Sequence, residues 1–185
     1  MGLYELGKKD GFGKYTWSDG SYFIGEWKDN KIHGMVINSI IKGIYYWADG
    51  RKFAGEWKNS KMNGFGIFYW KDGRVYKGEY KEDKKHSFGM YYGVDNKKYE
   101  GNWEFGSQKH LGKYTKKDGS LKLGYWDDNK ISKAIVNHEE VHAAITEIDN
   151  MVSFTLEKVE LVLQGMKLIF ISYLPNVEFE GLLGM

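Results

Sequence analysis

One motif in the sequence has the residue types of a metal site: His138-Glu139-Glu140-Val141-His142. On a helix, the two imidazoles of His-Glu-x-x-His lie on one face at a spacing that binds zinc, and the glutamate lies beside a metal-bound water. A catalytic zinc also needs a third ligand, for which Glu157 or Glu160 would have to serve, and a walled cavity. Nothing nearby supplies a substrate-binding strand. We therefore interpret the motif as a solvated first helical turn and predict no metal and no cofactor.

Other catalytic signatures are missing from the sequence. It has no Gly-x-x-x-x-Gly-Lys-Ser/Thr loop for phosphates, and no local pattern joins its Ser, His and Asp residues into a triad. The chain has no cysteine, which excludes thiol catalysis and disulfides and makes a cytoplasmic location the default expectation. The sequence therefore predicts a protein that is not an enzyme.

The dominant feature of the chain is an internal repeat. A glycine followed two residues later by an aromatic recurs at spacings of 23, 30, 23, 23 and 23 residues, in the pairs Gly2/Tyr4, Gly25/Trp27, Gly55/Trp57, Gly78/Tyr80, Gly101/Trp103 and Gly124/Trp126. A second glycine series and a series of Asp-Gly or Asp-Asn pairs keep the same phase. Such a fixed period predicts an array of stacked structural units.

Each unit has the pattern of a β-hairpin. In the unit at residues 53–73, Phe53, Gly55 and Trp57 alternate with Ala54 and Glu56, as the two faces of a strand require. A second run places Gly64, Gly66, Phe68 and Trp70 on one face, and Asp72-Gly73 is a hairpin signal leading to the next unit.

Stacked hairpins predict a mainly β fold, an elongated single-layer antiparallel sheet with a C-terminal α-helical segment. At about 4.8 Å between strands, one unit lengthens the sheet by roughly 9.6 Å. Aromatic rings are expected to lie over the glycines of the neighbouring strand, where a Cβ would collide. The rings therefore have two candidate roles: holding the sheet together, and offering an apolar face to another molecule.

The units resemble the MORN-repeat family, with its aromatic-x-Gly-Glu-Trp pattern, lysine-containing turn, Gly-x-Gly and closing Asp-Gly. The resemblance covers residues 2 to about 132, in roughly five and a half units. It implies a twisted sheet of successive hairpins used for scaffolding, at membranes, the cytoskeleton or cilia, with a groove that in some members holds a partner helix. We divide the chain into a repeat array at 2–132 and a helical tail at 133–185.

Several positions depart from the pattern. An apolar seven-residue insertion at residues 35–41 accounts for the spacing of 30 and suggests a bulge or flap. The fourth unit has Ser87, Gly93 and Asn96 at repeat positions, and the last has Lys122 for an aromatic and Lys116 where Trp17, Trp47 and Trp70 stand earlier. Groove binding is therefore expected in the middle of the array.

The tail has the pattern of one long amphipathic helix from residue 138 to a stop at Leu174-Pro175. Asn137 is the predicted N-cap, and Glu139 and Glu140 complement the helix dipole. Its apolar residues form one stripe: Val141, Ile145, Ile148, Val152, Leu156, Val159, Leu163, Met166 and Phe170. About 35 residues give roughly 50 Å, the length of the sheet, and a break at Gly165 is a further possibility.

Three arrangements of this helix stay open. It can fold back over the aromatic face of its own array, pair two chains in a homodimer through a coiled-coil seam, or bind another protein. The repeats carry 24 Lys+Arg against 17 Asp+Glu, and the tail carries 3 against 8. These opposite charges favour contact between tail and array.

The leading functional hypothesis is a non-catalytic scaffold that binds a helix or strand of a partner protein within a larger complex, in the cytoplasm and by resemblance at the cytoskeleton or a cilium. Large aromatics dominate interface energies, and the candidate anchors are Trp27, Trp47, Trp57, Phe68, Trp70, Tyr80, Tyr91 and Trp103.

The alternative hypothesis is attachment to an acidic membrane surface through turn lysines: Lys28, Lys31, Lys58, Lys61, Lys81, Lys84 and Lys85. The charge of the array is a weak footprint for nucleic acid, which is not expected as a partner.

Overall fold

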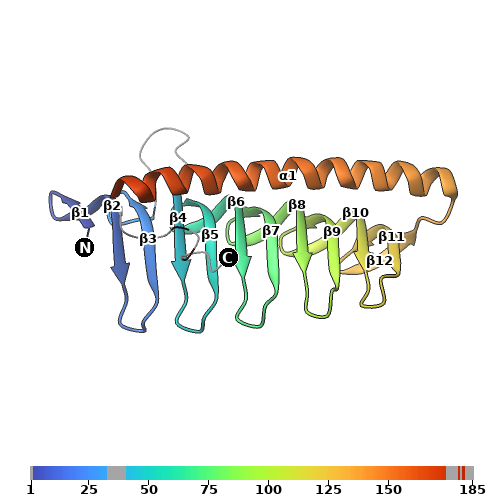
Figure 1. Cartoon of the computed structure of the whole chain (residues 1–185), viewed down its shortest axis with the longest axis horizontal. Coiled ribbons are helices and arrows are strands. Elements are labelled where there is room, and N and C mark those ends of the chain that lie inside the picture. Colours follow the sequence, from blue (N-terminus) through green and yellow to red (C-terminus); the bar gives the residue numbers. More distant parts are fainter. Residues whose placement is uncertain (1, 33–40, 174–178, 180, 182–185) are drawn as a thin grey trace.

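The chain forms one open antiparallel sheet with a single long helix laid along it (Figure 1). The computed structural model describes residues 2–32, 41–173, 179 and 181. Its strands are β1 (Gly2–Glu5), β2 (Lys8–Thr16), β3 (Tyr22–Trp27), β4 (Ile41–Tyr46), β5 (Lys52–Lys58), β6 (Lys61–Tyr69), β7 (Val75–Lys81), β8 (Lys84–Tyr92), β9 (Lys98–Glu104), β10 (Ser107–Thr115), β11 (Leu121–Asp127) and β12 (Lys130–Ala134). The helix is α1 (His138–Tyr173).

The 12 strands follow one another in the sheet in the order of the sequence, so each pairs with its chain neighbours. This confirms the predicted sheet of stacked hairpins. The predicted boundary at residue 132 falls inside β12. The insertion at residues 35–41 lies outside the described residues except for Ile41, where β4 begins. No helix among the described residues is long and apolar enough to span a bilayer.

Two kinds of turn join the strands, one along each of the two long sides of the sheet, where the strands end. These long sides are called edges below. At one edge, two-residue turns hold both residues in the left-handed region, as at Asn59 and Ser60 with φ of 53° and 62°. Such turns match the twist of the flanking strands. At the other edge, three-residue turns end in a glycine such as Gly73, whose φ is +90°. The predicted Asp-Gly signal marks this second kind of turn, in which Asp72 accepts hydrogen bonds from Arg74.

A row of glycines crosses the sheet at right angles to its strands. Opposed pairs link it from strand to strand, including Gly43 with Gly55, Gly55 with Gly66 and Gly66 with Gly78. The ring of Phe53 lies directly over two of them, and a Cβ on Gly66 would lie 2.5 Å from its Cζ atom. The expected placement of rings over glycines is therefore confirmed.

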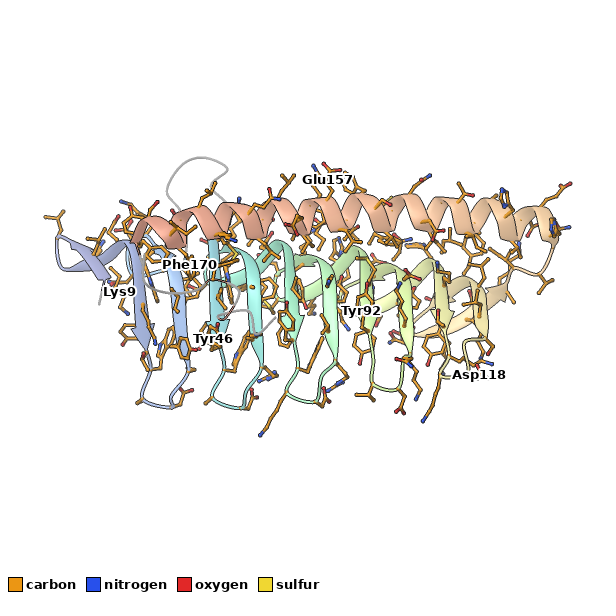
Figure 2. All side chains as sticks on the ribbon, viewed as in Figure 1. Lys9, Tyr46, Tyr92, Asp118, Glu157 and Phe170 are labelled. Atoms are coloured by element: carbon orange, nitrogen blue, oxygen red, sulfur yellow. The ribbon has the colours of Figure 1, made fainter. Side chains whose placement is uncertain are left out.

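Helix α1 covers the face of the sheet opposite to the rings that lie over the glycine row; the face with those rings is here called the aromatic face. Its buried residues Val159, Met166 and Phe170 pack against Ile24, Ile44, Ala54 and Ile67, while Ala144 and Ile148 pack against Met90, Leu111 and Leu123. Figure 2 shows Phe170 between the helix and the sheet, with Glu157 on the outer side. The helix does fold back on its own array, but the predicted contact with the aromatic face is wrong. Alternation explains this, because Ala54 and Ile67 point away from Phe53 and Trp57.

The helix is continuous for 36 residues, so the suggested break at Gly165 does not occur. A Cβ at Gly165 would lie 2.5 Å from Nζ of Lys42, so the glycine leaves room for a lysine that rises from β4. At the other end, Oδ1 of Asn137 accepts the N–H of Glu139 at 2.9 Å, which confirms the predicted N-cap. The predicted stop at Leu174-Pro175 lies outside the described residues.

Charged groups also attach α1 to the sheet. The ammonium of Lys113 on β10 lies 3.1 Å from the buried carboxylate of Glu100 and 3.0 Å from Asp149 on the helix. The apolar stripe and this ion pair use the inner side of α1 within one chain. The structure therefore does not show that stripe as a seam between two chains or as a surface offered to another protein.

Candidate docking surface on the aromatic face

The aromatic face of the sheet contains two sets of rings at different depths. The deeper set, here the inner ring column, is a zigzag of edge-to-face contacts with centroids 5.1 to 5.7 Å apart. It consists of Trp27, Phe23, Trp57, Phe53, Tyr80, Tyr76, Trp103, Tyr99 and Trp126, all buried. Edge-to-face pairs of this kind stabilise beyond their buried area.

The tryptophans of the inner ring column also satisfy the backbone. The indole N–H of Trp57 donates to the carbonyl of Gly43 at 3.1 Å, and that of Trp103 donates to Gly89 at 3.1 Å. Each bond joins residues 14 positions apart across the glycine row. These rings are therefore part of the sheet's interior and are not free to contact a partner.

The second set, here the outer ring row, lies nearer the three-residue turns and is largely half-buried. It runs through Trp17, Tyr45, Trp47, Phe68, Trp70 and Tyr91, with neighbouring centroids 4.4 to 5.9 Å apart. Phe68 is buried, and the other five keep part of their surface in solvent. No described residue of α1 packs on this row, because the helix lies on the other face.

Cations accompany the outer ring row. The guanidinium of Arg51 lies 5.4 Å from the ring centre of Trp47, and that of Arg74 lies 5.3 Å from Trp70. Both arginines follow an Asp-Gly turn and pair with its aspartate, Asp49 or Asp72. A hollow of about 500 Å³ lies between these two turns and is lined by Trp70 and both arginines.

Lys85 is enclosed by rings on the same face. Its ammonium lies 4.0 Å from the ring centre of Trp103 and 5.2 Å from that of Tyr91. Burial, followed by the nearby charge of Arg74, lowers the pKa of Lys85 to about 8. No carboxylate among the described residues lies within 4 Å of this ammonium, so the rings are its main attractive partners.

Beyond the last ring of the outer row lies a basic hollow, here the lysine pocket. Its volume is about 680 Å³, and it is lined by Lys97, Tyr114, Lys116, Lys117, Asp118 and Lys122. Asp118 lies at the tip of its hairpin (Figure 2) and accepts hydrogen bonds from the N–H and hydroxyl of Ser120 at 2.9 and 2.6 Å.

The structure divides the eight candidate anchors. Trp27, Trp57, Tyr80 and Trp103 belong to the inner ring column, and Phe68 is also buried. Trp47, Trp70 and Tyr91 keep exposed surface and lie together in the outer ring row. Residue type alone does not separate these groups, because both are aromatic and share a face. Depth depends on distance from the glycine row.

The seven turn lysines are divided as well. Lys31, Lys58, Lys81 and Lys84 are exposed along the edge with the two-residue turns. Lys28 lies 2.7 Å from Asp10, Lys61 pairs with Glu82, and Lys85 points into the aromatic face. Acidic groups therefore neutralise part of this edge.

The histidines of the His-Glu-x-x-His motif are exposed in the first turns of α1. Glu157 follows His142 by 15 residues, or about 22 Å of helix, and so cannot complete a site with it. Among the described residues, no three His, Asp or Glu side chains are grouped to hold a metal ion.

The sequence analysis missed several residues of this surface. Trp17 and Tyr45 extend the outer ring row, and Arg51, Arg74 and Lys97 form a line of cations beside it. The signal was available in the sequence, because each of these three cations directly follows the Asp-Gly or Asp-Asn pair of its turn. Their proximity to the rings depended on the turn geometry.

Comparison with protein families agrees with this architecture. The family model described as MORN repeat matches residues 1–22, 23–35, 42–50, 53–73 and 76–98. No curated protein matches the chain.

Proposed function

The chain belongs to the MORN-repeat family, and from that premise we propose that it is a non-catalytic scaffold whose aromatic face binds a segment of a partner protein. Repeats of this family are in general modules for interaction with proteins or membranes. One observation carries the choice of surface. The outer ring row keeps tryptophan and tyrosine surface in solvent on the face that α1 does not occupy.

The physical basis is the energy of burying these rings. Tryptophan and tyrosine are enriched among residues that dominate interface energies, particularly where they are already held rigid by neighbours. Trp47 and Trp70 are held by Phe68 at centroid distances of 5.3 and 4.4 Å. A partner side chain placed on them would therefore cost little ordering of the surface.

The test is affinity purification with the full chain and with Trp47→Ala/Trp70→Ala. We expect the double variant to lose the partner captured by the unaltered chain while keeping its circular dichroism spectrum. Lys58→Ala/Lys81→Ala, at exposed positions on the other edge, is the matched control and should retain the partner. Equal capture by all three proteins would rule out the outer ring row as the binding surface.

Peripheral attachment to an acidic membrane is the second candidate. It is favoured by the exposed lysines Lys31, Lys58, Lys81 and Lys84, which share an edge with Phe105, 61% exposed at the tip of a two-residue turn. Sedimentation with phosphatidylserine vesicles, compared with phosphatidylcholine vesicles, tests it. Salt-sensitive pelleting that is lost in Lys58→Glu/Lys81→Glu/Lys84→Glu is expected, and absence of pelleting would end this proposal.

The cytoplasmic setting rests on the lack of cysteine in the sequence, and placement in a cytoskeletal or ciliary assembly rests on family analogy. Imaging of the tagged full chain together with cytoskeletal and ciliary markers tests it. A diffuse distribution in ciliated and non-ciliated cells would count against it.

A further inference from the structure

The aromatic face changes its chemistry along the sheet. At the repeat position held by Trp17, Trp47 and Trp70, the fourth unit has Gly93 and the fifth has Lys116. At the position held by Phe53, Tyr76 and Tyr99, β11 has Lys122. The outer ring row therefore runs from the end of β2 to β8, and beyond it lysines stand at two repeat positions that hold rings in earlier units.

The basic end carries an excess of positive charge. Four lysines line the lysine pocket, and its single acidic residue, Asp118, is engaged by Ser120. Lys117 has a distant partner in Asp95, at 3.6 Å, and Lys116 is half-buried beside Tyr114. A carboxylate brought into this hollow would meet several ammonium groups at once.

Lys85 connects the aromatic and basic parts. Its ammonium lies 5.9 Å from the ring centre of Trp70 and 5.2 Å from that of Tyr91, at the last rings of the outer ring row. Gly93 removes the side chain that a tryptophan would place at the next repeat position. An ammonium held among rings favours an incoming carboxylate, since attraction between charges is stronger away from bulk water.

We propose, on the basis of the function proposed above, that the bound segment is a two-part protein sequence with apolar or aromatic residues at one end and Asp or Glu residues at the other. The apolar part lies on Trp47 and Trp70, and the acidic part reaches Lys85 and the lysine pocket. Trp70 and Lys116 follow strands β6 and β10, which are four strand spacings apart, or about 19 Å. That separation corresponds to roughly six residues of extended chain or about 13 residues of helix.

The ring geometry favours a protein segment over a single-stranded nucleic acid. Nucleic-acid bases bind by stacking on open ring faces. Here guanidinium groups lie over Trp47 and Trp70, at 5.4 and 5.3 Å from the ring centres. These guanidinium groups compete with a base for the ring faces.

The test is selection of a displayed library of random 20-residue peptides on the immobilised full chain. We expect enriched peptides to combine an apolar block with an acidic block and to lose at least tenfold in affinity to Trp47→Ala/Trp70→Ala. Selection on Lys116→Glu/Lys122→Glu should instead enrich Lys or Arg in the second block. Lys58→Glu/Lys81→Glu is the matched charge control and should select the same peptides as the unaltered chain.

The outcomes separate the two proposals. Peptides that depend on Trp47 and Trp70 but carry no acidic block, or whose acidic block is unaffected by Lys116→Glu/Lys122→Glu, would overturn this inference and leave the proposed function standing. Failure to select any peptide that depends on the tryptophans would count against both. A fluorescent dT20 oligonucleotide tests the nucleic-acid alternative. Binding that is lost in Trp47→Ala/Trp70→Ala and in Lys116→Glu/Lys122→Glu would assign the surface to nucleic acid and overturn the inference.

Discussion

At the scale of single residues, the fold depends on a contact between rings and bare backbone. Phe53 covers Gly55 and Gly66, and Tyr76 covers Gly78 and Gly89 in the same way. No other residue can occupy the covered positions without moving a ring that is already fixed by its neighbours. The periodic glycines of the sequence are therefore determined by packing, whereas those of the turns are determined by φ.

These two kinds of glycine predict different costs of substitution. Gly66→Ala should lower the free energy of unfolding by about 3 kcal/mol, because its Cβ would lie 2.5 Å from the ring of Phe53 and 2.8 Å from the carbonyl oxygen of Ala54. Gly73→Ala should cost about 1 kcal/mol, since space is open there and only its left-handed backbone is strained. Urea denaturation measures both, and equal costs would contradict this account of the glycine row.

The buried charge of Lys85 is expected to lower the stability of the fold in a pH-dependent way. Lys85→Met should raise the free energy of unfolding at pH 7 by about 1 to 2 kcal/mol, because it removes a buried charge that water screens only in part. The repeat itself supplies a precedent, since Met62 is buried at the same position one unit earlier.

The sign with pH follows from the lowered pKa of Lys85, about 8 in the folded chain against 10.5 for the free side chain. The folded state binds this proton less tightly, so the penalty is full below pH 8 and disappears as pH rises toward 10.5. The advantage of Lys85→Met over the unaltered chain should shrink over that range in denaturation series. An advantage that does not change with pH would contradict the assignment to charge.

At the scale of elements, α1 is held by its inner side. A matched pair of substitutions tests this: Met166 is fully buried, and Leu168 is 70% exposed two residues later. Met166→Ala should cost about 2 to 5 kcal/mol of stability, and Leu168→Ala less than about 0.5 kcal/mol. Thermal denaturation followed at 222 nm measures the difference. A larger effect at Leu168 would mean that the helix uses its outer side.

The sequence predicted the elements more fully than their arrangement. Period-2 alternation and the turn residues determine hairpins locally, and the spacing of apolar residues from Val141 to Phe170 determines the helix. The face that α1 covers is a choice between two apolar surfaces of one sheet. The helix packs on the face with Ile24, Ile44, Ala54, Ile67, Met90 and Leu123, and alternation along the strands does not distinguish that face from the other as its docking surface.

The sequence predicted which face holds the candidate site but did not predict which rings on that face are exposed. Alternation identified the aromatic face, but it cannot separate Trp57, at 3% exposure, from the half-buried Trp70. Depth on that face is set by indole bonds to glycine carbonyls and by contacts between rings of different units. These contacts join residues that are distant in sequence and become visible only in three dimensions.

At the scale of the whole molecule, α1 joins two apolar clusters that lie at opposite ends of the sheet. Met166 belongs to the cluster with Ile24, Ile44 and Ile67, and Ile148 to the cluster with Met90 and Leu123. Repeat proteins are stabilised by contacts between neighbouring units, so damage at one end need not spread evenly.

Hydrogen exchange should detect this division. Ile148→Ala is expected to reduce amide protection mainly in β8 to β11, and Met166→Ala mainly in β3 to β6. Each variant serves as the control for the other. Uniform loss of protection across all strands in both variants would indicate that the sheet and α1 unfold as a single cooperative unit.

The course of α1 has a consequence for biosynthesis. Its residues 159–170 pack on strands that are translated more than 80 residues earlier, because the helix runs back from β12 towards β2 (Figure 1). The first hairpins therefore emerge with Phe12, Ile24 and Ile44 uncovered, because the helix that covers them is translated much later. During that interval a nascent chain exposes an apolar strip, the kind of surface to which holding chaperones bind.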